Sequence, residues 1–136
     1  MSRPRTLASL PLPEVLWRLA SHVPGILHMT TRGIQRVHAL GIGVDAWPDQ
    51  RHHPALVSGS SAQFDALAMS LLSHTAQKGL TPKLEFWDNW RCELFLHTHG
   101  WLRGTGIDES APLLHAVAGA CLLAFEIQAG RTGWLE

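Results

Sequence analysis

The stretch SSAQFDALAMSLLSHTAQKGLTPKLEFWDNWRCELFLHTHGWLR, residues 60–103, decides the fold of this 136-residue chain. Ser60 and Gln63 have the spacing of a capping box, and apolar residues then recur at helical intervals. Gly79 and Pro82 end that pattern. The sequence therefore predicts a helix over residues 60–78 whose buried face holds Phe64, Leu67, Ala68, Leu71, Leu72 and Thr75.

Polar and apolar residues alternate after Lys83, which is the period of a strand with one buried face. We interpret Asp88-Asn89 as a two-residue hairpin turn, because both residue types tolerate positive φ. Gly100 allows a second turn and a third short strand. A small antiparallel sheet is expected around residues 83–103. In its second strand Trp90, Cys92, Leu94 and Leu96 face one way, and Arg91, Glu93, Phe95 and His97 face the other.

A last helix is predicted over residues 108–128. Asp108 or Ser110 would cap it, and Pro112 is tolerated in its first turn. Its many alanines indicate close packing on the sheet. The expected fold class is α+β: a helix–β-hairpin or meander–helix layer with two helices on a small antiparallel sheet, plus an N-terminal helical segment.

Residues 12–43 form that N-terminal segment in our interpretation. A helix begins near Pro11 and Pro13 and ends at Pro24-Gly25. Residues 26–43 suit either a short helix or a strand, and we choose the helix. A helix-turn-helix over residues 14–40 is a weaker alternative, because Pro24 falls inside its turn.

The remaining segments complete one domain. Residues 1–11 are expected to be flexible, residues 44–59 to be a connection, and residues 44–136 to hold the α-β-β-(β)-α unit. Such a long connection is unusual in a compact domain and is often functional.

Composition excludes several classes of protein. Eleven basic and eleven acidic residues balance, which argues against a nucleic-acid coat, and the length does not fit a barrel enzyme. Only 16% of residues are charged, against a usual level of about 25%. The surface is therefore expected to associate with another molecule or with a second copy of the chain. No secretory or membrane-spanning stretch is recognised, and a cytoplasmic location is expected. Cys92 and Cys121 are predicted to be buried free thiols.

The second half of the chain resembles small phage accessory proteins with the phage ABA sandwich domain. The resemblance covers residues 44–126 and rests on Trp47-Pro48, the helix start at Ser61, the aromatic-rich second strand and the Ser110-Ala111-Pro112 start of an alanine-rich helix. Residues 56–59, Leu-Val-Ser-Gly, depart from the family's pattern. The resemblance implies a mobile-element setting: a host-takeover, replication-accessory or anti-defence protein that acts by binding.

The residues favoured as a binding site surround the hairpin: Trp87, Trp90, Arg91, Trp101 and Arg103. Trp and Arg are frequent interface anchors, and they also suit base stacking and phosphate contacts. The competing interpretation is that these aromatics are covered within the chain, with the N-terminal helix carrying Leu16, Trp17 and Leu19 as the obvious cover.

A metal site is a weaker hypothesis. His97 and His99 would point to the same side of a strand, and His52-His53 with Asp108 or Glu109 could complete a two-His-plus-carboxylate set. Without a metal motif, half-exposed histidines beside a turn explain the pattern better. No catalytic residue and no cofactor is predicted, because the GxSxG elbow, HExxH and phosphate-loop motifs do not occur.

The sequence therefore favours stoichiometric binding to a host protein without catalysis. A homodimer is plausible through the hairpin or the N-terminal helix. Two alternatives stay open: nucleic-acid or nucleotide binding through the Trp/Arg face, and a small His-based metal-dependent hydrolase.

Overall fold

Three helices and two separate antiparallel sheets make up the computed structural model, which describes residues 10–30, 33–36, 60–109 and 111–130. Within those residues the fold is α+β, as predicted. The elements, in chain order, are α1 (Leu12–Ala20), β1 (Leu27–Thr30), β2 (Gly33–Arg36), α2 (Ser61–Gln77), β3 (Thr81–Phe86), β4 (Trp90–Leu96), β5 (Gly100–Thr105) and α3 (Pro112–Gln128).

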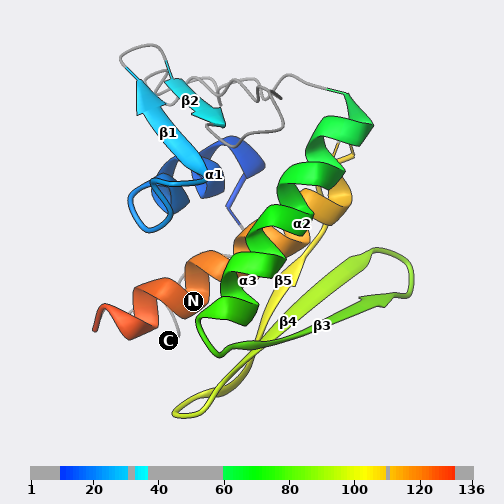
Figure 1. Cartoon of the computed structure of the whole chain (residues 1–136). Coiled ribbons are helices and arrows are strands. Elements are labelled where there is room, and N and C mark those ends of the chain that lie inside the picture. Colours follow the sequence, from blue (N-terminus) through cyan, green and yellow to red (C-terminus); the bar gives the residue numbers. More distant parts are fainter. Residues whose placement is uncertain (1–9, 31–32, 37–59, 110, 131–136) are drawn as a thin grey trace, which may run out of the picture.

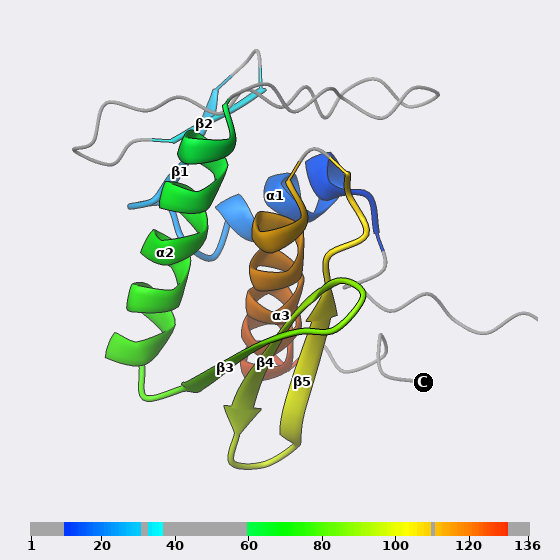
Figure 2. The ribbon, with the colours of Figure 1, turned by 90° about the vertical axis from the view of Figure 1, so that its right-hand side faces the viewer.

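Helix α3 is the centre of the molecule. It packs on strands β4 and β5 on one side, beside α2 on a second and against α1 on a third (Figures 1 and 2). Every residue from Leu114 to Ile127 is buried, including His115 and Glu126. The sequence predicts one broad apolar face, whereas the structure buries this helix all round, as expected of a helix that is apolar on every side.

The larger sheet has the strand order β3-β4-β5, and both pairings are antiparallel. Cys92, Leu94 and Leu102 lie on its inner face, beneath α3, and are buried. At Gly104 the helix comes so close that an added Cβ would lie 2.0 Å from the Ala116 carbonyl oxygen. The close packing that the alanines of α3 predict is therefore present at β5.

Helix α2 begins with the predicted capping box. Gln63 N–H donates to Ser60 Oγ at 3.2 Å, and Ser60 N–H donates to Gln63 Oε1 at 2.7 Å. Gly79 follows the helix with φ +83°, a conformation that favours glycine. The six predicted face residues are all buried: Phe64, Leu67, Ala68, Leu71, Leu72 and Thr75.

The predicted second N-terminal helix is wrong. Helix α1 is present, but residues 27–30 and 33–36 form the paired strands β1 and β2, with Leu27 opposite Arg36 and Thr30 opposite Gly33. A helix-turn-helix over residues 14–40 is therefore excluded. The short apolar run fits both the helical period and the strand period. Because Gly33 weakens a helix, the β-branched residues decide in favour of strands.

The predicted two-residue turn at Asp88-Asn89 is also wrong. Phe86 pairs with Trp90, so three residues, Trp87 to Asn89, connect β3 to β4. None of the described non-glycine residues has positive φ, so the special backbone expected of this turn is not used. Trp87 consequently belongs to the loop and not to a strand.

The other local predictions have mixed outcomes. Strand β5 exists, and it begins at Gly100 with φ +75°. Helix α3 has Pro112 in its first turn, but its N-cap is Ala111, without a side-chain cap on the helix itself. Asp108 instead accepts from Ala111 N–H at 3.0 Å, one residue before the helix. Both cysteines are buried and free, as predicted.

Among the described helices, none is long and apolar enough to cross a membrane. Several predictions concern segments outside the described residues: the flexible start at residues 1–9, the whole connection 44–59 with Trp47-Pro48 and His52-His53, and the possible cap Ser110.

Candidate binding surface

The outer face of the β3-β4-β5 sheet is the candidate binding surface. It is the side turned away from α3 (Figure 2). Strand pairing places its side chains in three cross-strand rows, because residues directly opposite one another share a face. The rows are Thr81–Phe95–Trp101, Lys83–Glu93–Arg103 and Glu85–Arg91–Thr105.

The first row carries an exposed aromatic pair. The Phe95 and Trp101 rings meet edge to face, with centroids 5.3 Å apart, while 38% and 48% of the two residues remain exposed. Lys83 Nζ lies 5.8 Å from the centroid of the Trp101 ring, at the outer limit of a cation–π contact. Large aromatic groups on a sheet face usually find a cover, and this exposed pair is the reason the outer face is the candidate surface.

Charges of alternating sign occupy the other two rows. Glu93, on the middle strand, is almost buried, and its carboxylate lies 3.7 Å from Arg103 Nη2. Lys83 Nζ lies 3.5 Å from Glu85 Oε1 on the same strand. The Trp87 indole N–H donates to Glu85 Oε2 at 3.3 Å and so helps to hold the pKa of that carboxyl below its usual range.

The five predicted site residues are distributed over two faces and a loop. Arg91, Trp101 and Arg103 share the outer face, and the alternation along the second strand predicts this placement for Arg91. Trp90 lies on the inner face, half-buried against the Phe86 ring at a centroid distance of 5.3 Å. Trp87 lies at the tip of the hairpin and is 66% exposed.

Helix α1 does not cover the outer face, although the sequence offers it as a cover. It packs against α3 and β1, and its Leu16 and Leu19 are fully buried there. Within the described part of the chain, no element lies across the outer face of the sheet.

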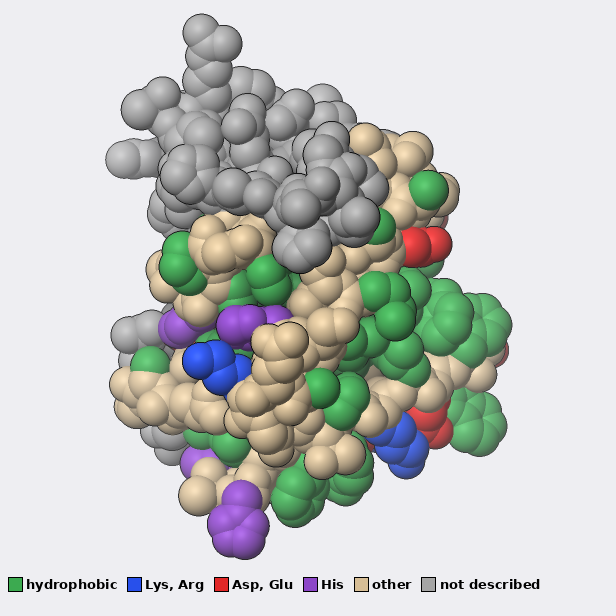
Figure 3. Space-filling model, in the orientation of Figure 1, with side chains coloured by type: hydrophobic (Ala, Val, Ile, Leu, Met, Phe, Trp, Pro, Cys, Tyr) green, Lys and Arg blue, Asp and Glu red, His purple; other side chains and the backbone are tan. Residues whose placement is uncertain are grey.

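The inner side of β3 is a second exposed apolar region. Helix α3 covers β4 and β5, and α2 meets β3 where that strand begins (Figure 2). Leu84 and Phe86 therefore stay 39% and 62% exposed although they point to the core side. Figure 3 shows hydrophobic side chains gathered over the β3–β4 hairpin, beside α2.

The histidines do not assemble as the metal hypothesis requires. His97 and His99 are exposed and lie in the turn after β4, not on a strand. The His99 ring contacts the Thr98 hydroxyl at 2.7 Å. Among the described residues, no three His, Cys, Asp or Glu side chains are grouped to hold a metal.

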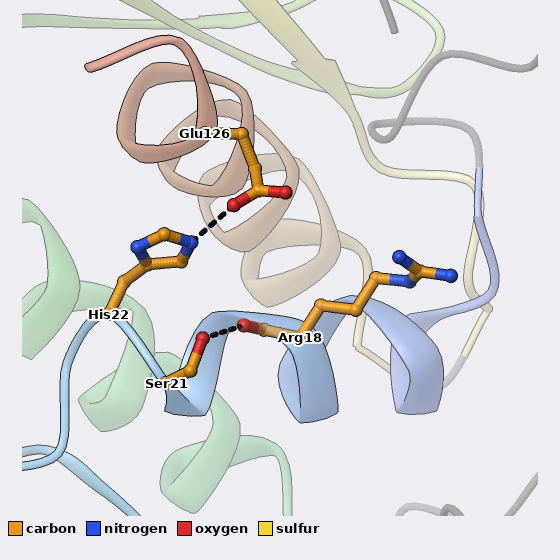
Figure 4. Close-up of polar contacts among 4 residues, drawn as sticks. All are labelled: Arg18, Ser21, His22 and Glu126. Carbon is orange, nitrogen blue, oxygen red and sulfur yellow. Dashed lines mark hydrogen bonds and ion pairs between the residues drawn. The ribbon is translucent and has the colours of Figure 1, made fainter. Parts of the chain in front are cut away.

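A polar pair between α3 and the residues that follow α1 was not predicted from the sequence. His22 follows α1, and its Nε2 lies 2.6 Å from Glu126 Oε2 of α3, with both side chains nearly buried (Figure 4). The two residues are 104 positions apart, and no local pattern could have indicated their contact.

A shallow groove lies near that pair. It has a volume of about 380 Å³ and is lined mainly by α2, including Met69, Ser73 and His74. The His74 ring meets the Phe125 ring edge on, at 5.9 Å between centroids, and His22 approaches Phe125 at 5.8 Å. Burial, with a smaller effect of Lys78, lowers the pKa of His74. The residues around the groove supply no grouped acid, base and nucleophile.

Comparison with known proteins gives no relative. No protein-family model matches the chain, and no curated protein or solved structure matches it.

Proposed function

We propose that this chain acts by stoichiometric binding to another protein, through the outer face of the β3-β4-β5 sheet. The setting we propose is the one that the phage ABA sandwich resemblance implies, in which a mobile-element protein binds a host protein. The exposed Phe95–Trp101 pair carries the proposal, because rigid aromatic anchors beside arginines are typical of the centre of protein interfaces.

The charges on this face favour a protein partner over nucleic acid. Three cations, Lys83, Arg91 and Arg103, share the face with two carboxylates, Glu85 and Glu93. Arg103 is already close to Glu93, and a phosphate backbone would meet both carboxylates as well. A patterned surface of both signs suits a protein whose charges complement it.

The buried thiols are poor candidates for covalent chemistry. Burial raises the pKa of Cys92 to about 12, with a smaller contribution from Glu93. Burial also raises the pKa of Cys121. A nucleophilic cysteine must be a thiolate near neutral pH, so both thiols are better explained as part of the core.

The proposal is tested by capture from a host extract with Trp101→Ser beside the wild-type chain. Trp101 is 48% exposed, so the variant should keep its circular dichroism spectrum and lose a captured protein that the wild type retains. Ile107→Ser is the matched control, because Ile107 is 57% exposed and lies beyond the end of β5. Equal capture by Trp101→Ser and the control would contradict the proposal.

The nucleic-acid alternative predicts a different result. Binding to single-stranded oligonucleotides would weaken steeply with salt and would depend on Arg91 and Arg103. If Arg103→Glu abolishes such binding while the fold is kept, the alternative replaces the protein-binding proposal. Metal retained by the purified chain and lost in His97→Ala would instead support the hydrolase alternative.

A further inference from the structure

Strand β3 is an edge strand whose second side pairs with no strand in the described part of the chain. The Trp90 carbonyl accepts from Gly106 N–H at 2.8 Å, so the Trp90 backbone faces β5. Backbone groups alternate along a strand, and therefore Arg91 and its partner Glu85 face one another. Leu84 and Phe86 consequently turn their backbone groups to the open edge. Pro82 does so too, and its missing N–H removes no bond from the β3–β4 ladder.

The open edge also carries exposed apolar side chains. Leu84 and Phe86 lie on the inner side, where neither α2 nor α3 covers them. Native edge strands are usually protected, because an open edge with an apolar face pairs readily with another strand. A strand added at this edge would satisfy the backbone groups and bury both side chains at once.

A second copy of β3 fits this edge in one register. In a dimer with a two-fold axis, antiparallel pairing must place inner-face residues opposite inner-face residues. The residue numbers of any two paired positions must therefore add up to an even number. Two such registers overlap at five of the six strand residues. One centres on Lys83 and sets it opposite its own copy. The other centres on Leu84 and sets Lys83 opposite Glu85, and Pro82 opposite Phe86.

Only the register centred on Leu84 continues the charge pattern of the outer face. Within one chain a row reads Arg103, Glu93, Lys83 from β5 to β3. Across the axis the next residues would be Glu85 and then Arg91 of the second copy. The signs therefore alternate over five consecutive strands. The register centred on Lys83 breaks the alternation by placing two lysines side by side, which is destabilising.

We propose that the chain forms a symmetric dimer by antiparallel pairing of β3 with β3, centred on Leu84, giving one continuous six-stranded sheet. The two Leu84 backbones exchange hydrogen bonds on the axis, and each Phe86 N–H donates to the Pro82 carbonyl of the other copy. Two Lys83–Glu85 ion pairs lie on the outer face of this sheet, and the Leu84 and Phe86 side chains are buried on its inner face. The aromatic Phe95–Trp101 pairs stay exposed on the outer face of the dimer.

The test uses two charge-reversal variants, measured separately and as a mixture by native mass spectrometry. Lys83→Glu alone and Glu85→Lys alone each place like charges opposite one another, so both should be monomers at a concentration at which the wild type is a dimer. Mixed together, the two variants should form a heterodimer, because every facing pair is then of opposite sign. Glu109→Lys, an exposed change beyond β5, should stay a dimer.

The outcomes separate this register from other associations. If Lys83 itself lay on the axis, Glu85→Lys would remain a dimer, because its partner would be Thr81. Leu84→Lys gives a second, independent test, since it sets two like charges on the axis and should yield folded monomers by circular dichroism. A monomeric wild type, a dimer that survives in both single variants, or a mixture without heterodimer overturns the proposal. None of these measurements depends on the outer-face partner.

Discussion

His115 is a buried residue whose hydrogen bonds fix its charge. Its Nε2–H donates to the Leu10 carbonyl at 2.8 Å, and its Nδ1 accepts from Asp108 N–H at 3.1 Å. Only the neutral ring can make both bonds, because a proton on Nδ1 would face the Asp108 N–H. Burial accordingly lowers the pKa of His115 below 6.5, against smaller opposing effects of the Leu10 hydrogen bond and Asp108.

This pairing predicts acid sensitivity. Below pH 6.5 the unfolded chain takes up a proton on this residue more readily than the folded chain, so the free energy of unfolding falls as the pH drops. Above that pH the contribution of His115 is fully present. Urea unfolding followed between pH 7.5 and about 5.5 should show the decline, to which His74 also contributes.

The variant His115→Leu separates the contribution of His115 to this decline from that of His74. It removes the hydrogen bonds of His115 to the Leu10 carbonyl and the Asp108 N–H and should cost about 1–3 kcal/mol at neutral pH. It should also show a shallower decline in acid than the wild type. The exposed control His97→Leu should change the free energy of unfolding by less than about 0.5 kcal/mol. An unchanged pH dependence in His115→Leu would show that the ring titrates normally in the folded chain.

At the scale of the elements, the contact between β5 and α3 depends on glycine. A Cβ on Gly104 would lie 2.0 Å from Ala116 O and 2.6 Å from Ala120 N, both backbone atoms that cannot rotate away. Gly104→Ala should therefore lift α3 from the strand and lower the free energy of unfolding by about 1–3 kcal/mol, in the range of overpacked cores.

Gly25→Ala is the matched control for that change, because a Cβ there meets nothing within 4 Å. Its effect on the free energy of unfolding, measured by urea titration, should stay within about 0.5 kcal/mol. If Gly104→Ala unfolds at the same midpoint as the control, α3 does not approach β5 as closely as described.

The elements also show what sequence can and cannot predict. The α2 capping box, Pro112 and the alternation in β4 are local signals, and each indicates the correct element. The β1–β2 strand pair is missed because four-residue strands are too short to distinguish a strand period from a helical one.

The candidate surface was predictable only in part, for a related reason. Alternation places Arg91 and Phe95 on one face, but pairing Lys83 with Glu93 requires the length of the loop at Trp87–Asn89. A two-residue loop shifts the register by one position and changes every partner across the hairpin. The exposure of Leu84 and Phe86 depends on where α2 ends over β3, which no local pattern encodes.

At the scale of the whole molecule, α3 joins the N-terminal elements to the sheet. The Leu10 carbonyl is tied to α3 through His115, and His22 is tied to it through Glu126. Helix α1 buries Leu12, Leu16 and Leu19 in the same core that α2 and the sheet share. The N-terminal helix should therefore unfold together with the rest and not as a separate unit.

Hydrogen exchange and a double-mutant cycle test this cooperativity together. Amides of α1 should exchange as slowly as those of β4. The double-mutant cycle of His22→Ala and Glu126→Ala should give a coupling energy of about 1–3 kcal/mol, because both side chains are nearly buried. The cycle isolates this pair from the other contacts of Glu126. The Glu14–Arg18 pair, 3.3 Å apart on α1 and more exposed than His22 and Glu126, serves as control, with an expected coupling of about 0.3–0.5 kcal/mol. Equal coupling in the two cycles, or α1 amides that exchange far faster than those of β4, would mean that α1 is only loosely attached to α3.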